Sequence, residues 1–395
     1  MAATSFLIPP RLRFGEGVLS ELGREAQPLG RRALVVTGPA TAKLGRTGAA
    51  VDLLRGAGLA AQAFTGIARE PYVSDIDEGC RAAEALGADL IVGVGGGSAL
   101  DAAKAIAAQL ATGVPIADCE GSEKVRAALP VIAVPTTAGT GSEVTRFTVV
   151  TRPGKGGAQV KMLIASQLLI PRAALLDPSL LGSAPLSAAA AAGIDALTHA
   201  IEAYVSDVAQ PITDDLALSA IRRLAPRVAL AAHGQATPED LDALMLGALE
   251  AGMAFSNASV ALVHGMARPL GAFFDVPHGV ANAMLLPEVV RFSQDAAPAR
   301  YSRIAQALGE SGEDAADGVG AICELCRLPA PRDFGIDAAT LGASIGQMAR
   351  DALRSGSPQH NPRQASVQEI EAIYVRALLG TGDGMAFAKR QGALE

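Results

Sequence analysis

The stretch Leu90–Lys104 reads LIVGVGGGSALDAAK and joins a short apolar run to a helical pattern through three consecutive glycines. A short apolar run bounded by glycine is typical of a strand buried on both faces of a parallel sheet. The glycines let the backbone pass close to a phosphate, and a helix that begins at Ser98 offers free N–H groups and a positive dipole end. The stretch therefore predicts a pyrophosphate site, with a glycine-rich turn capped by Ser98 as the alternative.

Strand and helix patterns alternate on both sides of this stretch up to about residue 180. Further buried strands are predicted at Ala33–Thr37, Ala61–Thr65 and Val131–Val134, and helices at Thr41–Ala57, Val73–Leu86 and Ser98–Leu110. After Pro185 the strand patterns end, and helical segments follow at Ala188–Ser206, Thr213–Leu224, Pro238–Phe255 and Ser366–Leu379. We therefore predict an α/β domain with a Rossmann-like parallel sheet over residues 1–180 and an all-α domain over residues 181–395.

The composition excludes several classes of protein. Half of the 395 residues are apolar and 18% are charged, which suits large buried cores rather than a disordered chain. The 33 Lys and Arg against 40 Asp and Glu give a net charge of -7 without a basic cluster, so nucleic acid is not an expected partner. No apolar stretch reaches the roughly 20 residues of a membrane span, and Met1–Pro10 has no features of a secretory leader.

The four cysteines are too few for the disulfide framework of a secreted protein, so we expect a cytoplasmic location. Cys323 and Cys326 form a CxxC pair, but no second pair accompanies them and they lie in an apolar helical pattern. We interpret them as core thiols rather than as a metal or redox site.

A second loop with ligand-binding character follows the predicted strand Val131–Val134. The segment Pro135–Thr145 reads PTTAGTGSEVT and combines hydroxyl side chains with two glycines. Ligands of open α/β sheets bind at the carboxyl ends of the strands, where this segment begins. It therefore predicts a second ligand loop, with a capped turn as the alternative.

Five histidines occur in the chain, and three of them lie in apolar surroundings. Asp195 and His199 are four residues apart in GIDALTHAIEAY, so a helix directs both side chains to one site. His264 and His278 bracket the segment HGMARPLGAFFDVPH. A single such histidine is usually a core or cap residue, whereas one carboxylate and three imidazoles together form a plausible ligand set for Fe²⁺ or Zn²⁺. The other two histidines lie in polar segments and are expected to be solvated.

Four motifs together resemble the iron-containing (group III) alcohol dehydrogenase family, namely GGGSALDAAK, PTTAGTGSEVT, GIDALTHAIEAYVS and HGMARPLGAFFDVPHGVANAMLLP. The resemblance extends from FGEG at Phe14–Gly17 to NPR at Asn361–Arg363. It implies the architecture shared with dehydroquinate synthase, with the active-site cleft between a dinucleotide-binding domain and a helical domain. It assigns a metal to Asp195, His199, His264 and His278, and the cofactor to Gly96, Gly97, Ser98, Asp101, Thr137, Thr140, Ser142 and Lys161.

The resemblance also implies a reaction, which is hydride transfer between a nicotinamide cofactor, NADP or NAD, and a small primary alcohol or aldehyde. Fe²⁺ is the expected metal and Zn²⁺ the alternative. The rival enzymes are a dehydroquinate-synthase-like cyclase or lyase, whose ligand set resembles one Glu with two His, and a zinc glycerol dehydrogenase. A non-catalytic metal-binding scaffold is a further alternative. A homodimer is expected through the β-forming segments Ser5–Ile8 and Leu12–Phe14, unless they pair within their own sheet.

Two positions depart from the family pattern. Gly38 follows the first predicted strand, at a position where the resemblance implies an Asp in NAD-preferring members of the family. Such an Asp would repel a 2′-phosphate, and Lys43 and Arg46 lie nearby in the sequence. The glycine predicts that NADP is accepted and preferred, with an ordinary turn residue at Gly38 as the alternative. Arg268 comes four residues after His264, at a position where the resemblance implies a second His in many members of the family, and that His belongs to the proton path. Arginine stays protonated and binds planar anions, so we predict a substrate with an acidic group, with a cofactor phosphate contact or a structural ion pair as the alternative.

Overall fold

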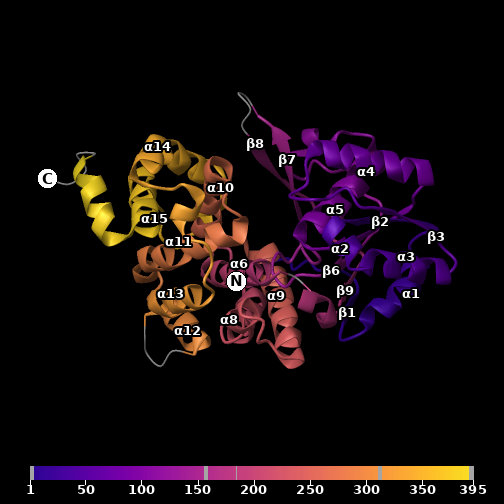
Figure 1. Ribbon diagram of the computed structural model, residues 1–395, viewed down its shortest axis with the longest axis horizontal. Helices are drawn as coiled ribbons and strands as arrows, with labels where there is room; N and C mark the ends of the chain where they lie inside the picture. Colours follow the sequence, from indigo (N-terminus) through magenta and orange to yellow (C-terminus); the bar gives the residue numbers. More distant parts are fainter. Residues whose placement is uncertain (1–3, 155–158, 184, 310–313, 391–395) are drawn as a thin grey trace. The chain divides into compact units, whose positions relative to one another are not determined.

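The computed structural model describes residues 4–154, 159–183, 185–309 and 314–390, and Figure 1 labels most of its elements. The chain divides into two compact units. The α/β unit contains Ser5–Ala184 and Thr237–Met245, and the helical unit contains Pro185–Ala236 and Leu246–Glu395. The predicted combination of an α/β part and an all-α part is confirmed. The α/β unit also includes Thr237–Met245, which lie well beyond the domain boundary predicted between residues 180 and 181.

Six parallel strands form the central sheet of the α/β unit, in the order β1-β9-β6-β4-β2-β3. The strands are β1 (Leu12–Phe14), β2 (Arg32–Thr37), β3 (Ala60–Phe64), β4 (Leu90–Gly95), β6 (Val131–Pro135) and β9 (Ala173–Leu176). The helices of this unit are α1 (Leu22–Ala26), α2 (Pro39–Lys43), α3 (Arg46–Gly56), α4 (Val73–Leu86) and α5 (Gly97–Thr112). The four predicted strands all occur, as β2, β3, β4 and β6.

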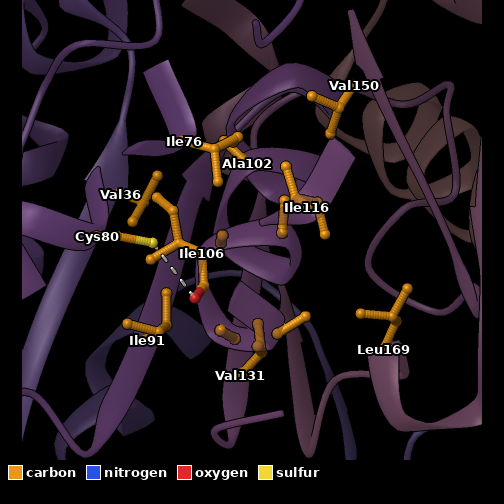
Figure 2. Close-up of a cluster of buried hydrophobic side chains, with 14 of the residues drawn as sticks. Val36, Ile76, Cys80, Ile91, Ala102, Ile106, Ile116, Val131, Val150 and Leu169 are labelled. Atoms are coloured by element: carbon orange, nitrogen blue, oxygen red, sulfur yellow. Dashed lines mark hydrogen bonds between the residues drawn. The ribbon is translucent and has the colours of Figure 1, made fainter. Parts of the chain in front are cut away.

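Both faces of the central sheet are buried, and each belongs to its own hydrophobic core. Val36 of β2 packs in one core with Ile76 of α4 and Ile106 of α5, as Figure 2 shows. Its neighbour Val35 belongs to the other core, together with Leu54 of α3. Because alternate side chains enter two apolar cores, the strand sequences read as continuous apolar runs.

A second, smaller sheet has the order β5-β8-β7, and the sequence pattern does not predict it. Its strands are β5 (Gly121–Ser122), β7 (Phe147–Pro153) and β8 (Gln159–Ala165). Strands β7 and β8 are antiparallel, with Phe147 opposite Ala165. Strand β7 begins at Phe147, two residues after the end of the segment Pro135–Thr145, so this sheet fixes the far end of the second predicted loop.

Two glycines with positive φ mark breaks in helical segments, and one of them lies inside a predicted helix. The helix predicted at Thr41–Ala57 is two helices, because Gly45 between α2 and α3 has a left-handed φ of 76°. In the helical unit, α15 (Val367–Arg390) is broken at Gly380, which has φ 72° and ψ 177°. The predicted segment Ser366–Leu379 ends just before this break.

The helical unit surrounds α11, which packs against α6, α10, α13 and α15. Its helices are α6 (Leu186–Val205), α7 (Pro211–Leu224), α8 (Val228–Ala232), α9 (Pro238–Ala258, whose first turns belong to the α/β unit), α10 (Leu262–Phe274), α11 (His278–Ser293), α12 (Pro298–Leu308), α13 (Ala315–Leu325), α14 (Ala338–Arg354) and α15. None of the described helices has by itself the length and hydropathy of a membrane span, and only α9 and α10 taken together, across a bend of 101°, meet that criterion.

Candidate functional site

Helix α6 carries Asp195 and His199 one turn apart on a buried face. Both side chains are buried, and Nε2 of His199 lies 3.9 Å from Oδ1 of Asp195. The ring of His199 stacks on Phe255 of α9, with 4.0 Å between ring centroids. The contacts with Asp195 and Phe255 therefore limit the rotation of the His199 imidazole.

Helices α10 and α11 bring the two other predicted histidines to the same carboxylate. His264 is the third residue of α10, and its Nε2 lies 3.5 Å from Oδ1 of Asp195. His278 is the first residue of α11, and its Nε2 lies 3.6 Å from the same oxygen. Asp195, His199 and His264 form a group whose donor atoms all lie within 4.8 Å of one another. His278 is half-buried and completes the predicted set from the edge of this group.

The donor set fits a divalent metal ion. Nε2 of His264 is buried and has no hydrogen-bond partner in the described part of the chain, while Nδ1 of the same ring lies 2.5 Å from Oε2 of Glu202. Burial lowers the pKa of His264, but the charges of Glu202 and Asp195 outweigh it and raise that pKa to about 9. Burial raises the pKa of Asp195, but the three histidines hold it well below its usual range. A histidine that binds a metal through one ring nitrogen usually donates the N–H of its other ring nitrogen to a carboxylate. His264 has this arrangement, with Glu202 at Nδ1 and a buried Nε2.

Two residues that the sequence analysis did not identify support the predicted ligands. Glu202 contacts His264, as described above, and Nδ2 of Asn282 donates to Oδ1 of Asp195 at 2.7 Å. Both are buried. Glu202 follows His199 by three residues and Asn282 follows His278 by four, so each lies about one helical turn from a predicted ligand. A polar residue at that spacing in an apolar helix was the available signal.

Arg268 lies one turn after His264 on α10. Its Nη1 donates to the carbonyl oxygen of Ser355 at 3.4 Å, and no ion pair of Arg268 occurs among the described residues. Burial lowers the pKa of its guanidinium, opposed by the negative charge of Glu202. A guanidinium carries five N–H donors, so most of its hydrogen-bonding capacity is left for a ligand or solvent. The alternative of a structural ion pair finds no partner in the described part of the chain.

The two predicted loops of the α/β unit contact each other at the ends of β4 and β6. A methyl group placed on Gly97 would lie 2.6 Å from Cγ2 of Thr140, and one on Gly96 would lie 3.3 Å from Oγ1 of Thr137. Glycine is therefore required where the loops approach most closely. Helix α5 begins at Gly97, so Ser98 lies in its first turn rather than before it. The free N–H groups of this turn form the part of the site that suits an anion.

Asp101 and Ser142, both predicted to contact the cofactor, hydrogen-bond to each other. Oγ of Ser142 donates to Oδ1 of Asp101 at 2.5 Å, and the amide of Val149 donates to Oδ2 at 3.0 Å. Burial raises the pKa of Asp101, and the nearby charge of Lys104 opposes this shift. In this structure Asp101 therefore ties α5 to the second loop and to β7, and its direct contact with a cofactor stays a prediction.

A buried lysine beneath the loops was not identified from the sequence. Lys104 of α5 is fully buried, and its Nζ donates to the carbonyl oxygens of Thr145 at 3.0 Å and Phe147 at 2.9 Å. Burial lowers the pKa of Lys104 to about 8, although Asp101 and Glu143 oppose this. Burial likewise raises the pKa of Glu143 to about 7. The motif GGGSALDAAK therefore combines a glycine turn with a buried lysine that anchors the second loop.

Two further predicted cofactor residues lie outside this pair of loops. Gly38 precedes α2 at the end of β2, and a methyl group there would lie 2.4 Å from the carbonyl oxygen of Ile67. Lys161 of β8 pairs with Glu70 at 2.8 Å. Contact of either residue with a cofactor stays a prediction.

The remaining histidines and the CxxC pair lie apart from the metal-binding group. His233 is exposed as expected, but His360 is half-buried and lies 2.8 Å from Asp207, so the expectation that it is solvated is wrong in part. Cys323 and Cys326 are free thiols. Burial raises the pKa of Cys326 to about 11 and that of Cys323 further, which agrees with inert thiols.

Comparison with known proteins extends this description to the whole chain. Residues 9–178 match the family described as iron-containing alcohol dehydrogenase, and residues 189–378 match the C-terminal part of the same family. The chain is 38% identical over 386 residues to 1,3-propanediol dehydrogenase of Klebsiella pneumoniae, covering 94% of this chain and 98% of the relative. It is 35% identical over 378 residues to lactaldehyde reductase of Escherichia coli (strain K12), covering 91% and 96%.

Solved structures agree with the sequence relatives. A 1,3-propanediol oxidoreductase matches with a TM-score of 0.89 at 36% identity, over 95% of this chain and 100% of that one. Sulfoacetaldehyde reductase from Bifidobacterium kashiwanohense, in complex with NAD⁺, matches with a TM-score of 0.86 at 28% identity, over 96% and 100%. The resemblance identified from the four motifs is thereby confirmed. The chain belongs to the iron-containing alcohol dehydrogenase family, and it is a metal-dependent oxidoreductase of alcohols and aldehydes.

Proposed function

We propose that the protein reversibly reduces a small aldehyde bearing an acidic group, such as a carboxylate, sulfonate or phosphonate, to the primary alcohol. Arg268 carries this proposal, because it lies one turn from His264 on α10 and its guanidinium makes only one long hydrogen bond, to Ser355, among the residues that the structure describes. Arginine binds planar or trigonal anions through two parallel hydrogen bonds, which orients them as well as holding them. The name of one structural relative, sulfoacetaldehyde reductase, supports an anionic aldehyde as substrate.

Different residues are proposed to bind the metal ion and to bind the substrate. Asp195 and the three histidines hold the metal ion, and Arg268 binds the acidic end of the substrate so that the aldehyde end faces the metal-binding group. When bound, the ion supplies Lewis-acid polarisation of the substrate oxygen, and the nicotinamide supplies or accepts the hydride. Arg268 stays protonated at ordinary pH and cannot donate the proton that the product alcohol needs. That proton therefore has to come from a donor other than Arg268.

The substrate proposal is tested by comparing sulfoacetaldehyde with propanal in wild type and Arg268→Ala. We expect a loss in kcat/KM of about 30-fold or more on sulfoacetaldehyde, equivalent to roughly 2 kcal/mol, and a much smaller loss on propanal. Arg303→Ala, which removes an exposed arginine of α12 in the same unit, is the matched control and should leave both values unchanged. Equal losses on both aldehydes in Arg268→Ala would reject the acidic substrate.

We propose Fe²⁺ as the resident metal, with Zn²⁺ as the second candidate. One carboxylate and three imidazoles suit both ions, so ligand type does not select between them. The family to which the chain belongs favours iron. Metal-free protein reloaded with Fe²⁺ under anaerobic conditions should recover more turnover than protein reloaded with Zn²⁺, at equal metal content by mass spectrometry. The opposite order would assign zinc.

We propose that the enzyme accepts NADP(H) and prefers it to NAD(H). Gly38 has no carboxylate to repel a 2′-phosphate, and Lys43 at the end of α2 is exposed. The close approach of the Ile67 carbonyl complicates the simplest test, because any side chain at position 38 displaces that backbone. Gly38→Ala is therefore the matched control for Gly38→Asp, since it adds the methyl group without the charge.

The cofactor test uses the ratio of kcat/KM with NADPH to that with NADH. We expect the ratio in Gly38→Asp to fall about tenfold below that in Gly38→Ala, because a carboxylate repels the 2′-phosphate. Equal ratios in the two variants would contradict a role of position 38 in the choice of cofactor.

We further propose that the protein is a cytoplasmic homodimer. The four free thiols agree with a reducing compartment. Leu12–Phe14 forms strand β1 and pairs with β9, which is the intrachain pairing given as the alternative. Strand β1 lies at the edge of the six-stranded sheet, and an edge strand can pair with a second copy of the chain. Light scattering at micromolar concentration should give twice the mass of one chain, and a monomer would refute the dimer.

A further inference from the structure

One buried carboxylate, Glu202, connects two helices of the helical unit at the metal-binding group. It lies one turn beyond His199 on α6 and is only 3% exposed. Its Oε1 accepts from the amides of Val263 at 2.6 Å and His264 at 3.4 Å. Its Oε2 lies 2.5 Å from Nδ1 of the His264 ring. Both oxygens are therefore engaged at the beginning of α10.

The start of α10 has no cap of its own. The residue before the helix is Ala261, which has no polar side chain, so the first amides of α10 need acceptors from elsewhere. Glu202 supplies one from α6, and a carboxylate is also favoured there by the positive dipole end of the helix. His264 is the third residue of this helix. The hydrogen bonds between Glu202 and the first turn of α10 therefore also fix the position of His264 relative to α6.

The same carboxylate also selects the tautomer of His264. A carboxylate can only accept hydrogen bonds, so Nδ1 must carry the hydrogen that it donates to Oε2. In the neutral ring the hydrogen is then absent from Nε2, which points at Asp195 with its lone pair exposed. The buried Nε2 has no hydrogen-bond partner in the described part of the chain, as a nitrogen kept for a metal requires.

We propose that Glu202 is a positioning residue that holds His264 in the metal-binding tautomer and, through the same carboxylate, fixes the start of α10. The inference rests on the proposed metal site, and it adds that the affinity of this site depends on a residue that does not touch the metal. Removing such an outer partner of a histidine ligand typically lowers metal affinity 10- to 100-fold.

Glu202→Gln separates the two roles. The amide oxygen of glutamine can still accept from Val263 and His264, so the start of α10 is retained. The amide nitrogen then faces Nδ1 and can only donate, which forces the hydrogen of a neutral His264 ring onto Nε2. We expect the dissociation constant for Zn²⁺, measured by competition with a chromophoric chelator, to rise about 10- to 100-fold. The melting temperature of the metal-free protein should change much less than in Glu202→Ala, which loses both contacts.

Glu250→Gln is the matched control, because Glu250 is another largely buried carboxylate of the helical unit and hydrogen-bonds to Arg223 rather than to a histidine. It should bind Zn²⁺ as tightly as wild type. Wild-type affinity in Glu202→Gln would overturn the positioning role, whereas a wild-type protein that binds neither Zn²⁺ nor Fe²⁺ would instead overturn the proposed metal site.

A second measurement on the wild type does not depend on the folding of any variant. In Zn²⁺-loaded protein labelled with ¹⁵N at its five histidines, His264 should coordinate through Nε2 and keep a hydrogen on Nδ1. The ¹⁵N chemical shifts of the ring distinguish the two nitrogens. Coordination through Nδ1 would refute the proposal, whatever the affinity of the variants.

Discussion

The metal-binding group of the helical unit and the glycine loops of the α/β unit are built in different ways. The first consists of side chains on long helices, where Asp195 and His199 of α6 meet His264 of α10 within 4.8 Å. The second consists mainly of backbone, with Gly96 and Gly97 pressed against Thr137 and Thr140. Ligand geometry therefore depends on helix packing in one unit and on loop anchoring in the other, so the two sites should respond differently to the same kind of substitution.

The largest expected effect separates the two sites completely. His264→Ala removes one donor and should lower metal affinity more than about 100-fold, beyond the loss of an outer partner. Turnover should fall with it, while the dissociation constant for NADPH, measured by fluorescence titration, should change less than twofold because the loops belong to the other unit. Retention of both metal and turnover would show that His264 is not a ligand.

The next effect concerns the anchor beneath the loops. Lys104→Met removes the buried donor that the carbonyl oxygens of Thr145 and Phe147 share and should destabilise the protein by about 3 kcal/mol. The dissociation constant for NADPH should rise while metal content stays normal. Lys124→Met, at an exposed lysine of the same unit, is the control. If Lys104→Met unfolds in urea like wild type, the lysine is not an anchor.

A pH effect of intermediate size comes from the same cluster. Burial raises the pKa of Glu143 to about 7 from an unperturbed 4.5, so the folded state binds more protons than the unfolded state between these values. Stability from this group is therefore complete below pH 4.5 and is lost as the pH rises to about 7, by an amount on the order of 2 kcal/mol. Urea unfolding at pH 5 and pH 7.5 should show a smaller difference in Glu143→Gln than in wild type. An unchanged difference would mean that Glu143 does not titrate in this range.

The smallest effect distinguishes the two serines of the loops. Ser142→Ala removes the hydrogen bond to Asp101 and should lower the free energy of unfolding by about 1 kcal/mol. Ser98→Ala should leave stability nearly unchanged and instead weaken NADPH binding about fivefold, because Ser98 lies in the first turn of α5, where the phosphates are proposed to bind. If Ser98→Ala lowered stability and Ser142→Ala weakened NADPH binding instead, Ser98 would be the structural serine and Ser142 the cofactor-binding one.

Much of the candidate site could be predicted from local spacing. The strand–glycine–helix order of Leu90–Lys104 predicted β4, the turn and α5, and the four-residue interval between Asp195 and His199 placed both on one helical face. The small sheet of β7 and β8 could not be predicted in this way, because its residues are partly buried and mix apolar with polar types. Gly45 likewise ended a helix whose apolar spacing continued past it.

The sequence by itself determined the family, the alternation of strands and helices around Leu90–Lys104 and the types of residue that could hold a metal, since these depend on short-range patterns of glycine, histidine and apolar residues. Only the tertiary structure decided which groups hold those residues in place. Glu202 contacts His264 across 62 positions of sequence, and Lys104 contacts Thr145 across 41. Ile67 restricts position 38 through its backbone oxygen alone. The physical reason is that burial makes a hydrogen-bond partner obligatory for a charged group but does not specify which one, and the packing of helices and loops makes that choice.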